Sequence, residues 1–187
     1  MQRRRLGKTG LQVSVVGLGC NNFGDRCDFK ATKRVVVSAL EGRITFFDTA
    51  DTYGKRGGSE TFLGDMLGRR RKGVVLATKF SLPTVDNIYS RGGSRRYILQ
   101  AVEASLKRLK NDWIDLYQIH FPDLVTPIEE TLRALDDLVK HGKVRYVGCG
   151  NFTAWETLED EHCGSLKRQD RDPNRQGLTG AAAVDAG

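Results

Sequence analysis

The segment Ile44-Thr-Phe-Phe-Asp-Thr-Ala-Asp-Thr-Tyr-Gly54 begins as a buried strand and ends as a polar loop. Its β-branched and aromatic residues from Ile44 to Phe47 predict a short strand that is covered on both faces. Asp48 stands where this strand should end, and Tyr53 follows five residues later, just before Gly54. Enzymes of the α/β class place reactive side chains at the carboxyl ends of parallel strands. The segment therefore predicts one side of an active site.

Strand and helix patterns alternate along the chain on either side of this segment. We expect an N-terminal hairpin at residues 3–14 and strands at residues 13–20, 44–47, 74–79, 114–120 and 144–148. Apolar residues at helical spacing predict four helices between the strands. Their expected starts are Thr32, Ser59, Ser94 and Pro127. The alternation favours a parallel sheet with right-handed crossovers, and it leaves open both a doubly wound sheet and a closed (β/α)8 barrel.

Composition indicates an ordinary globular domain without a membrane span. The 187 residues are 39% hydrophobic and 28% charged, and no apolar run approaches the roughly 20 residues that a membrane helix needs. The formal charge of +7 comes from small basic clusters, which lack the interleaved aromatic residues of a single-strand nucleic-acid platform. We therefore expect neither a nucleic-acid nor a membrane partner, and the oligomeric state stays open. A polyanionic small molecule is the more natural ligand for such clusters.

Cysteine spacing argues against a metal centre. The chain has Cys20, Cys27, Cys149 and Cys163, and their separations match no zinc or CxxC pattern. We expect free thiols in a reducing, cytoplasmic environment, and no metal site.

The character of the sequence changes after about residue 151. Residues 153–161 are the expected start of a fifth helix, whereas residues 164–187 contain neither a strand-like run nor a sustained amphipathic period. We expect this last segment to be mostly disordered.

Four polar side chains stand at the ends of three expected strands. Asp48 and Tyr53 follow the strand at 44–47, Lys79 ends the strand at 74–79, and His120 ends the strand at 114–120. Because the carboxyl ends of parallel strands share one edge, the four can converge although they are far apart in the sequence. Each residue alone has an ordinary structural explanation, such as a loop contact or a semi-buried hydrogen bond. Four such residues at equivalent positions predict an active site.

This set of side chains suits the reduction of a carbonyl group. A free tyrosine, with a pKa of about 10, is a poor acid at neutral pH, and a neighbouring cation stabilises the phenolate. Lys79 can supply the cation and Asp48 can hold its ammonium group in place. Tyr53 can then protonate an oxygen that His120 orients. The hydride for such a reduction must come from a cofactor.

Several motifs give the chain a resemblance to a known family. They are Phe47-Asp-Thr-Ala-Asp-Thr-Tyr-Gly54, Leu76-Ala-Thr-Lys79, Asp115-Leu-Tyr-Gln-Ile-His120, Gly142-Lys-Val-Arg-Tyr-Val-Gly148 and Asn151-Phe152. With these motifs the chain resembles the aldo-keto reductases, which are cytosolic NADPH-dependent oxidoreductases with a (β/α)8, or TIM-barrel, fold. It looks closest to the branch that includes bacterial reductases and potassium-channel β-subunits.

The resemblance implies a function and a set of site residues. Tyr53 would donate the proton in the reduction of a small aldehyde or ketone to an alcohol, with Asp48, Lys79 and His120 as its partners. NADPH would lie against Gly19, Cys20, Asn21, Asp48, Gly150 and Asn151, and Asn151 would bind the nicotinamide carboxamide. The sequence departs from the family pattern at Gly150, which is more often serine, at Arg43, which is usually glycine, and at Phe121, which is often tryptophan or arginine.

The resemblance covers about residues 3–162 and reaches only the fifth strand. It implies an incomplete barrel at residues 1–162, with about five parallel strands, flanking helices and an N-terminal β-hairpin, followed by a tail at 163–187 unlike the family. Two strands would then be unpaired edges. The alternatives to an active reductase are an inactive truncated fragment and a non-catalytic regulatory or binding module of the same fold.

Overall fold

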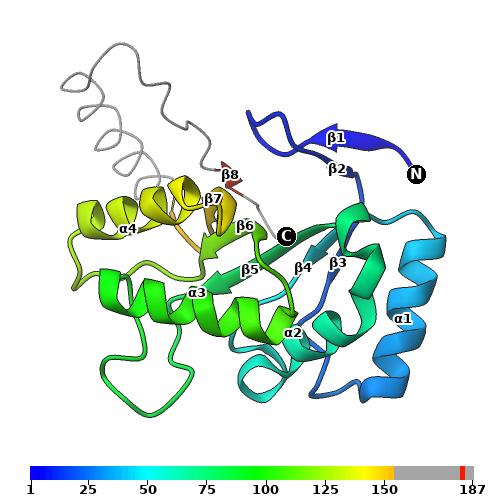
Figure 1. The fold of residues 1–187 in the computed structure, drawn as a ribbon, viewed down its shortest axis with the longest axis horizontal. Coiled ribbons are helices and arrows are strands. Elements are labelled where there is room, and N and C mark those ends of the chain that lie inside the picture. The colour runs from blue at the N-terminus through cyan, green and yellow to red at the C-terminus, as the bar shows by residue number, and fades with distance from the viewer. Residues whose placement is uncertain (154–181, 184–187) are drawn as a thin grey trace.

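The computed structural model describes residues 1–153 and 182–183 of the chain. An antiparallel hairpin of β1 (Arg3–Arg5) and β2 (Gln12–Ser14) comes first, and helices alternate with strands after it (Figure 1). The remaining elements are, in chain order, β3 (Gly17–Gly19), α1 (Phe29–Glu41), β4 (Phe46–Asp48), α2 (Tyr53–Leu67), the 3-10 helix η1 (Gly68–Gly73), β5 (Val75–Phe80), α3 (Arg95–Leu109), β6 (Ile114–Ile119), α4 (Ile128–Lys140), β7 (Val144–Cys149) and β8 (Ala182–Ala183).

The strands after the hairpin form one parallel sheet in the order β3-β4-β5-β6-β7-β8. From β3 to β7 each strand pairs with the next one in the sequence, and a helix lies in every connection. The helices pack beside one another, α1 on α2, α2 on α3 and α3 on α4 (Figure 1). A doubly wound sheet reverses its strand order part-way, whereas this sheet does not. The architecture is that of part of a (β/α)8 barrel, with the predicted N-terminal hairpin.

The two faces of the sheet are covered by different elements, because successive side chains of a strand point to opposite sides. The core between the sheet and the helices includes Phe47, Leu76, Ile98, Val102 and Tyr117. The core on the other face consists of Val13, Phe46, Ala77 and Leu116, with Leu6 and Leu11 packed against it. The hairpin therefore covers the face of the sheet opposite the helices.

The predicted first strand at residues 13–20 is wrong, since the structure divides it in two. Residues 12–14 belong to the hairpin and residues 17–19 to the sheet. Between them the Ser14 hydroxyl donates to Val16 O at 2.6 Å, and the Ser14 amide donates to Thr45 Oγ1 at 3.1 Å. These bonds turn the chain and leave Val15 and Val16 about half exposed, although both residues are apolar.

Two predicted helix caps are also wrong. Helix α1 is capped by Asp28, whose Oδ1 accepts from the Ala31 amide at 2.7 Å, while Thr32 is buried inside the helix. The regular part of α2 follows the non-helical residues 54–57 and so begins next to Ser59, as predicted. The Ser59 hydroxyl does not cap it, however, since it accepts from Thr49 Oγ1 at 2.8 Å and donates to Cys20 O at 2.8 Å. The predicted cap at Ser94 is confirmed, since its side chain accepts from the Tyr97 amide, and Pro127, the expected start of the fourth helix, directly precedes α4.

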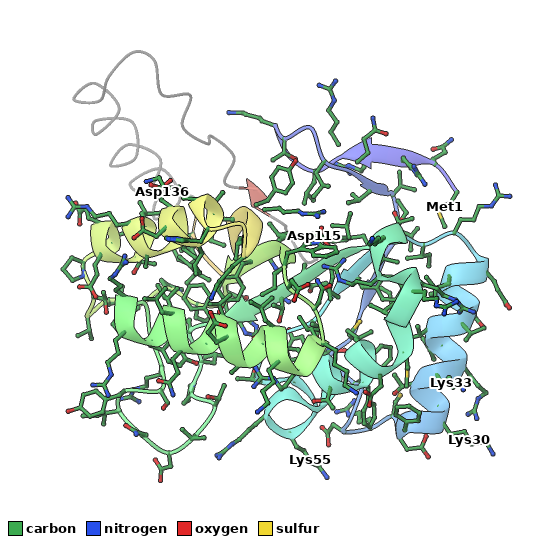
Figure 2. All side chains as sticks on the ribbon, viewed as in Figure 1. Met1, Lys30, Lys33, Lys55, Asp115 and Asp136 are labelled. Carbon is green, nitrogen blue, oxygen red and sulfur yellow. The ribbon has the colours of Figure 1, made fainter. Side chains whose placement is uncertain are left out.

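Helix α2 contains a left-handed turn directly after Tyr53. Residues 54–57 all have positive φ angles, from 57° to 100°, and Lys55 extends from this turn into solvent (Figure 2). At Gly54 (φ 69°) an added Cβ would lie 2.3 Å from Phe23 O and 2.5 Å from Ser59 N. Only glycine fits this position, because the chain is left-handed there and three backbone segments meet.

The C-terminal segment differs from expectation where the structure describes it. β8 pairs in parallel with β7, with Gly148 opposite Ala182 and Cys149 opposite Ala183. The predicted absence of strands in residues 164–187 is therefore wrong at these two positions, and the edge of β7 is not bare. The expected helix at 153–161 and the domain boundary after residue 162 lie outside the described residues. Among the described helices, none has the length and apolarity to cross a membrane.

Candidate active site

The four side chains that the sequence singles out converge at the carboxyl edge of the sheet. Asp48 is the last residue of β4, Lys79 lies in β5, His120 follows β6, and Tyr53 begins α2. The strand register accounts for this placement: Asp48 pairs with Ala77, and Lys79 pairs with Gln118. The active-site residues of a parallel sheet gather in this way because all strands end on the same side.

Lys79 is held by two oxygen atoms of the neighbouring strand. Its Nζ lies 2.6 Å from Asp48 Oδ2 and 3.0 Å from Thr49 O. The Lys79 side chain is only 10% exposed, whereas that of Asp48 is 31% exposed. A buried ammonium group is costly unless it is paired and hydrogen-bonded. Asp48 and Thr49 therefore fix the position of the Lys79 amine.

Tyr53 contacts both His120 and the lysine of this ion pair. Its hydroxyl is 3.5 Å from His120 Nε2, the outer limit of a hydrogen bond, and the two rings pack edge to face at 5.6 Å. Lys79 Nζ lies 5.1 Å from the centre of the Tyr53 ring, so the ammonium approaches the aromatic face. The phenol, imidazole, ammonium and carboxylate thus share one small region, as the sequence predicts.

His120 is electrically neutral at physiological pH. Burial, together with the positive charge of Lys79, lowers the pKa of His120 to about 4. Nδ1 of the ring is buried and has no hydrogen-bond partner among the described residues. A neutral imidazole carries one N–H, and Nε2 is the nitrogen that faces Tyr53. In the tautomer with the proton on Nε2, that proton faces the Tyr53 hydroxyl and can be donated to an oxygen atom.

Gln118 is a site residue that the sequence reasoning missed. Its Nε2 donates to Asp48 Oδ1 at 3.3 Å, and the side chain is 2% exposed. Asp48 therefore accepts a hydrogen bond on each carboxylate oxygen, from Lys79 and from Gln118. The signal that could have found Gln118 is its position two residues before His120, because residues at that spacing share a strand face.

The residues expected to contact a cofactor flank this cluster on both sides. Gly19 pairs with Asp48 in the sheet, and the buried Cys20 donates its amide to Asp48 O at 2.8 Å. On the other side the Gly150 amide donates to Ile119 O at 2.8 Å. Asn151 is exposed and its Nδ2 donates to His120 O at 2.8 Å. Asn21 is exposed at the same edge, next to Cys20.

Comparison with known proteins agrees with this fold. A sequence model described as "Aldo/keto reductase family" matches residues 15–168. The chain belongs to the aldo/keto reductase family. It is 41% identical to "Uncharacterized oxidoreductase YrpG" of Bacillus subtilis, over 85% of this chain and 52% of that protein. It is 39% identical to "Aldo-keto reductase YhdN" of the same organism, over 82% of this chain and 48% of that protein.

A further relative of this aldo/keto reductase chain has a different name. The chain is 35% identical to "Probable voltage-gated potassium channel subunit beta" of Oryza sativa, over 85% of this chain and 49% of that protein. The chain spans about half the length of the curated relatives that it matches.

Proposed function

We propose that this aldo/keto reductase chain carries the proton-donor site of an NADPH-dependent reductase that converts aldehydes and ketones to alcohols. The observation that supports the proposal is the approach of the Tyr53 hydroxyl to 3.5 Å from His120 Nε2, beside the Lys79–Asp48 ion pair. No single contact in this arrangement is unusual. Together they join a proton donor, a cation and a neutral hydrogen-bond donor around one position.

Each of the four residues has a distinct role in this proposal. Tyr53 donates its proton to the carbonyl oxygen as negative charge develops there. His120, which is neutral, donates a hydrogen bond from Nε2 and orients the same oxygen. Lys79 stabilises the phenolate that remains after proton transfer, because its positive charge lies beside the ring. Asp48 holds the Lys79 ammonium in place, and Gln118 holds the second oxygen of Asp48.

The residues present at this edge fit part of a nicotinamide cofactor. Nothing lies within 4 Å of the position that a Cβ would take on Gly19, so a flat ring can approach the backbone there. Asn151 is exposed, and an asparagine side chain can both donate to and accept from a carboxamide. We assign Gly19, Cys20, Asn21, Asp48, Gly150 and Asn151 to cofactor contact. NADPH, when bound, supplies the hydride for the reduction.

The proposed substrate is a small carbonyl compound, and the proposed setting is the cytoplasm. Phe121 is 41% exposed, and its ring lies 5.2 Å from that of His120. An apolar ring beside the oxygen-orienting histidine favours a substrate with an apolar group next to its carbonyl. We place the reductase site in residues 1–162, outside the segment at 163–187.

A non-catalytic regulatory module is the second candidate function. It is favoured by the 35% identity to a probable channel β-subunit. A regulatory module of the same fold keeps the family architecture without needing turnover. NADPH affinity and turnover together separate the two functions.

The experiment measures NADPH binding by quenching of cofactor fluorescence, and reduction of 4-nitrobenzaldehyde by loss of NADPH absorbance. We expect saturable binding and measurable turnover. Tyr53→Phe should lower turnover at least about 100-fold while binding NADPH as before. Tyr89→Phe, at a tyrosine that is 55% exposed, is the matched control and should change neither property.

Each outcome has one meaning. Retained turnover in Tyr53→Phe would overturn the proton-donor role. Saturable NADPH binding without turnover would favour the regulatory module. Absence of NADPH binding by the wild-type chain would overturn the cofactor assignment.

A further inference from the structure

A second group of ionisable side chains is buried behind the candidate active site, between the sheet and the helices. Asp51 is 1% exposed and lies two residues before Tyr53, and Glu60 of α2 is fully buried. Glu60 accepts from Thr78 Oγ1 at 2.5 Å and from Arg108 Nε at 2.6 Å. The proposed reaction uses none of these side chains, so their burial requires a separate explanation.

Asp51 has fewer partners than a buried carboxylate needs. Its Oδ1 is buried and has no hydrogen-bond partner in the part of the chain that the structure describes. Its Oδ2 lies 3.3 Å from the Tyr97 hydroxyl of α3. The buried group holds two carboxyl groups, Asp51 and Glu60, and Arg108 is its one cation among the described residues. With both carboxyls ionised, the group would carry a net negative charge away from water.

The hydrogen bonds available to the Tyr97 hydroxyl also favour a protonated Asp51. It lies within hydrogen-bonding distance of two acceptors, Leu82 O at 3.1 Å and Asp51 Oδ2 at 3.3 Å. A tyrosine hydroxyl has one proton and cannot donate fully to both. If Asp51 is protonated, its carboxyl donates to the Tyr97 oxygen and Tyr97 donates to Leu82 O. Asp51 Oδ2, the Tyr97 oxygen and Leu82 O then each take part in a hydrogen bond, and the unpartnered Oδ1 belongs to a neutral carboxyl group, which costs less to bury than a carboxylate.

Asp51 and Leu82 belong to the two connections that carry the proposed reaction. The Asp51 amide donates to Lys79 O at 3.1 Å, and the Tyr53 amide donates to Ala50 O at 3.1 Å. Leu82 follows Lys79 by three residues and lies just beyond the end of β5. The Tyr97 hydroxyl thus links the connection leading to Tyr53 with the connection leaving Lys79.

We propose that Asp51 is a positioning residue for Tyr53 and Lys79, and that its protonated carboxyl keeps the Tyr97 hydroxyl bonded to Leu82 O. When Asp51 loses its proton, the Tyr97 hydroxyl turns to the carboxylate and releases Leu82. The two connections at the edge of the sheet are then no longer tied together. The effect on activity rests on the proposed reductase function. If that function holds, the rate of carbonyl reduction should fall as Asp51 ionises.

The groups that face Asp51 agree with a protonated form near neutral pH. Burial raises the pKa of Asp51 to about 7, and the negative charge of Glu60 acts in the same direction. Arg108 and the hydroxyl of Tyr97 oppose this rise. From β6, the buried hydroxyl of Tyr117 also feels the charge of Asp51. A titration in the neutral range is therefore built into the chain next to the proton donor.

The test follows the backbone amide signals of Tyr53 and Leu82 by NMR from about pH 5 to about pH 9. Wild-type protein should show one common inflection near neutral pH at both amides. Asp51→Asn keeps the shape of the side chain, stays neutral, and should abolish that inflection. An inflection that persists unchanged in Asp51→Asn, or two flat wild-type curves, would overturn the proposal.

Two milder variants keep the test decisive if Asp51→Asn fails to fold. Glu60→Gln removes a negative neighbour and should move the inflection to lower pH. Tyr97→Phe removes a donor to Asp51, should move the Tyr53 inflection to higher pH, and should uncouple the Leu82 amide from it. An unmoved midpoint in both variants, or a Leu82 amide that still follows Asp51 in Tyr97→Phe, rejects the role of the Tyr97 hydroxyl.

Carbonyl reduction over the same pH range provides the functional measurement. The wild-type rate should fall at least about threefold above the inflection, and this decrease should be absent in Asp51→Asn. If the wild-type chain reduces no carbonyl compound at any pH, the proposed function fails. The NMR titration still decides whether protonation of Asp51 positions Tyr53 and Leu82, so the two failures can be told apart.

Discussion

Lys79 Nζ lies 2.6 Å from Asp48 Oδ2, and this ion pair joins the neighbouring strands β5 and β4 at the edge that carries the candidate site. The pair is mostly shielded from water on the lysine side, where exposure is 10%, and open on the aspartate side, where it is 31%. Its contribution to stability therefore lies between that of a surface pair and that of a fully buried pair.

We predict that Asp48→Asn and Lys79→Met each destabilise the protein and that their effects are not additive. Removing either partner leaves the other charge uncompensated, whereas the double variant removes both charges. The coupling free energy should be about 1–3 kcal/mol. Urea unfolding of the two single variants and the double variant measures it, and additive effects would show that the pair contributes nothing.

Ionisation of His120 and of Asp51 changes the free energy of unfolding in opposite directions. The two effects should nearly cancel between about pH 4 and about pH 6.5. The folded protein holds the pKa of His120 near 4, below its usual value of 6.5, so this residue's contribution is present above pH 6.5 and is lost as the pH falls. The pKa of Asp51 is raised from 3.8 to about 7, so its contribution is present below pH 3.8 and is lost as the pH rises. Single variants should separate the two effects.

We predict opposite slopes in the two variants. With His120→Gln the Asp51 effect remains, so the free energy of unfolding should fall with rising pH by up to about 1.4 kcal/mol per unit. With Asp51→Asn the His120 effect remains, and stability should rise with pH. Thermal or urea unfolding across this range measures both slopes. Equal slopes in wild type and both variants would contradict the two assignments.

Gly54 should be intolerant of any side chain. In Gly54→Ala the new Cβ would meet Phe23 O and Ser59 N at 2.3 and 2.5 Å in a left-handed backbone. We expect a loss of at least about 2 kcal/mol of stability. Gly58→Ala is the matched control, because its Cβ would meet nothing closer than 3.7 Å and its φ is not positive. It should be neutral or stabilising by up to about 1 kcal/mol.

Arg43 occupies a conformation that favours glycine. Its φ is 60°, and a left-handed residue with a Cβ costs about 1–2 kcal/mol. Arg43→Gly should therefore raise the free energy of unfolding by about 0.5–1 kcal/mol after the entropy cost of glycine is included. Arg43→Ala removes the same side chain without freeing the backbone and should give no such gain. Chemical unfolding of both variants compares them directly.

Hydrophobic periodicity and residue type predicted most of the strands and helices from the sequence alone. The strands expected at 74–79, 114–120 and 144–148 correspond to β5, β6 and β7 with ends that differ by one residue. These strands are rich in β-branched and aromatic residues and lie between clear breaks, so their pattern favours strands. The expected strand at 13–20 failed because the Ser14 hydroxyl accepts from the Thr45 amide at 3.0 Å and donates to Val16 O at 2.6 Å. A propensity pattern does not contain such long-range contacts.

The candidate site was predictable for a related reason, and only in part. A carboxylate, a tyrosine, a lysine and a histidine at the ends of parallel strands must share one edge, so Asp48, Tyr53, Lys79 and His120 follow from topology. Gln118 follows from the same rule, but its amide looks like an ordinary polar residue in a strand. The roles of all these residues in catalysis and cofactor binding remain predictions.

Local sequence determined that this chain forms parallel strands with helical crossovers and which side chains end each strand, because backbone propensity and side-chain alternation act over a few residues. Tertiary structure alone decided that Tyr97 meets Asp51 and Leu82, and that Arg108 meets Glu60. Those contacts join residues from separate elements, and they depend on how α2 and α3 rotate and pack on the sheet. No local pattern encodes that packing, so the buried charges behind Tyr53 appear only in three dimensions.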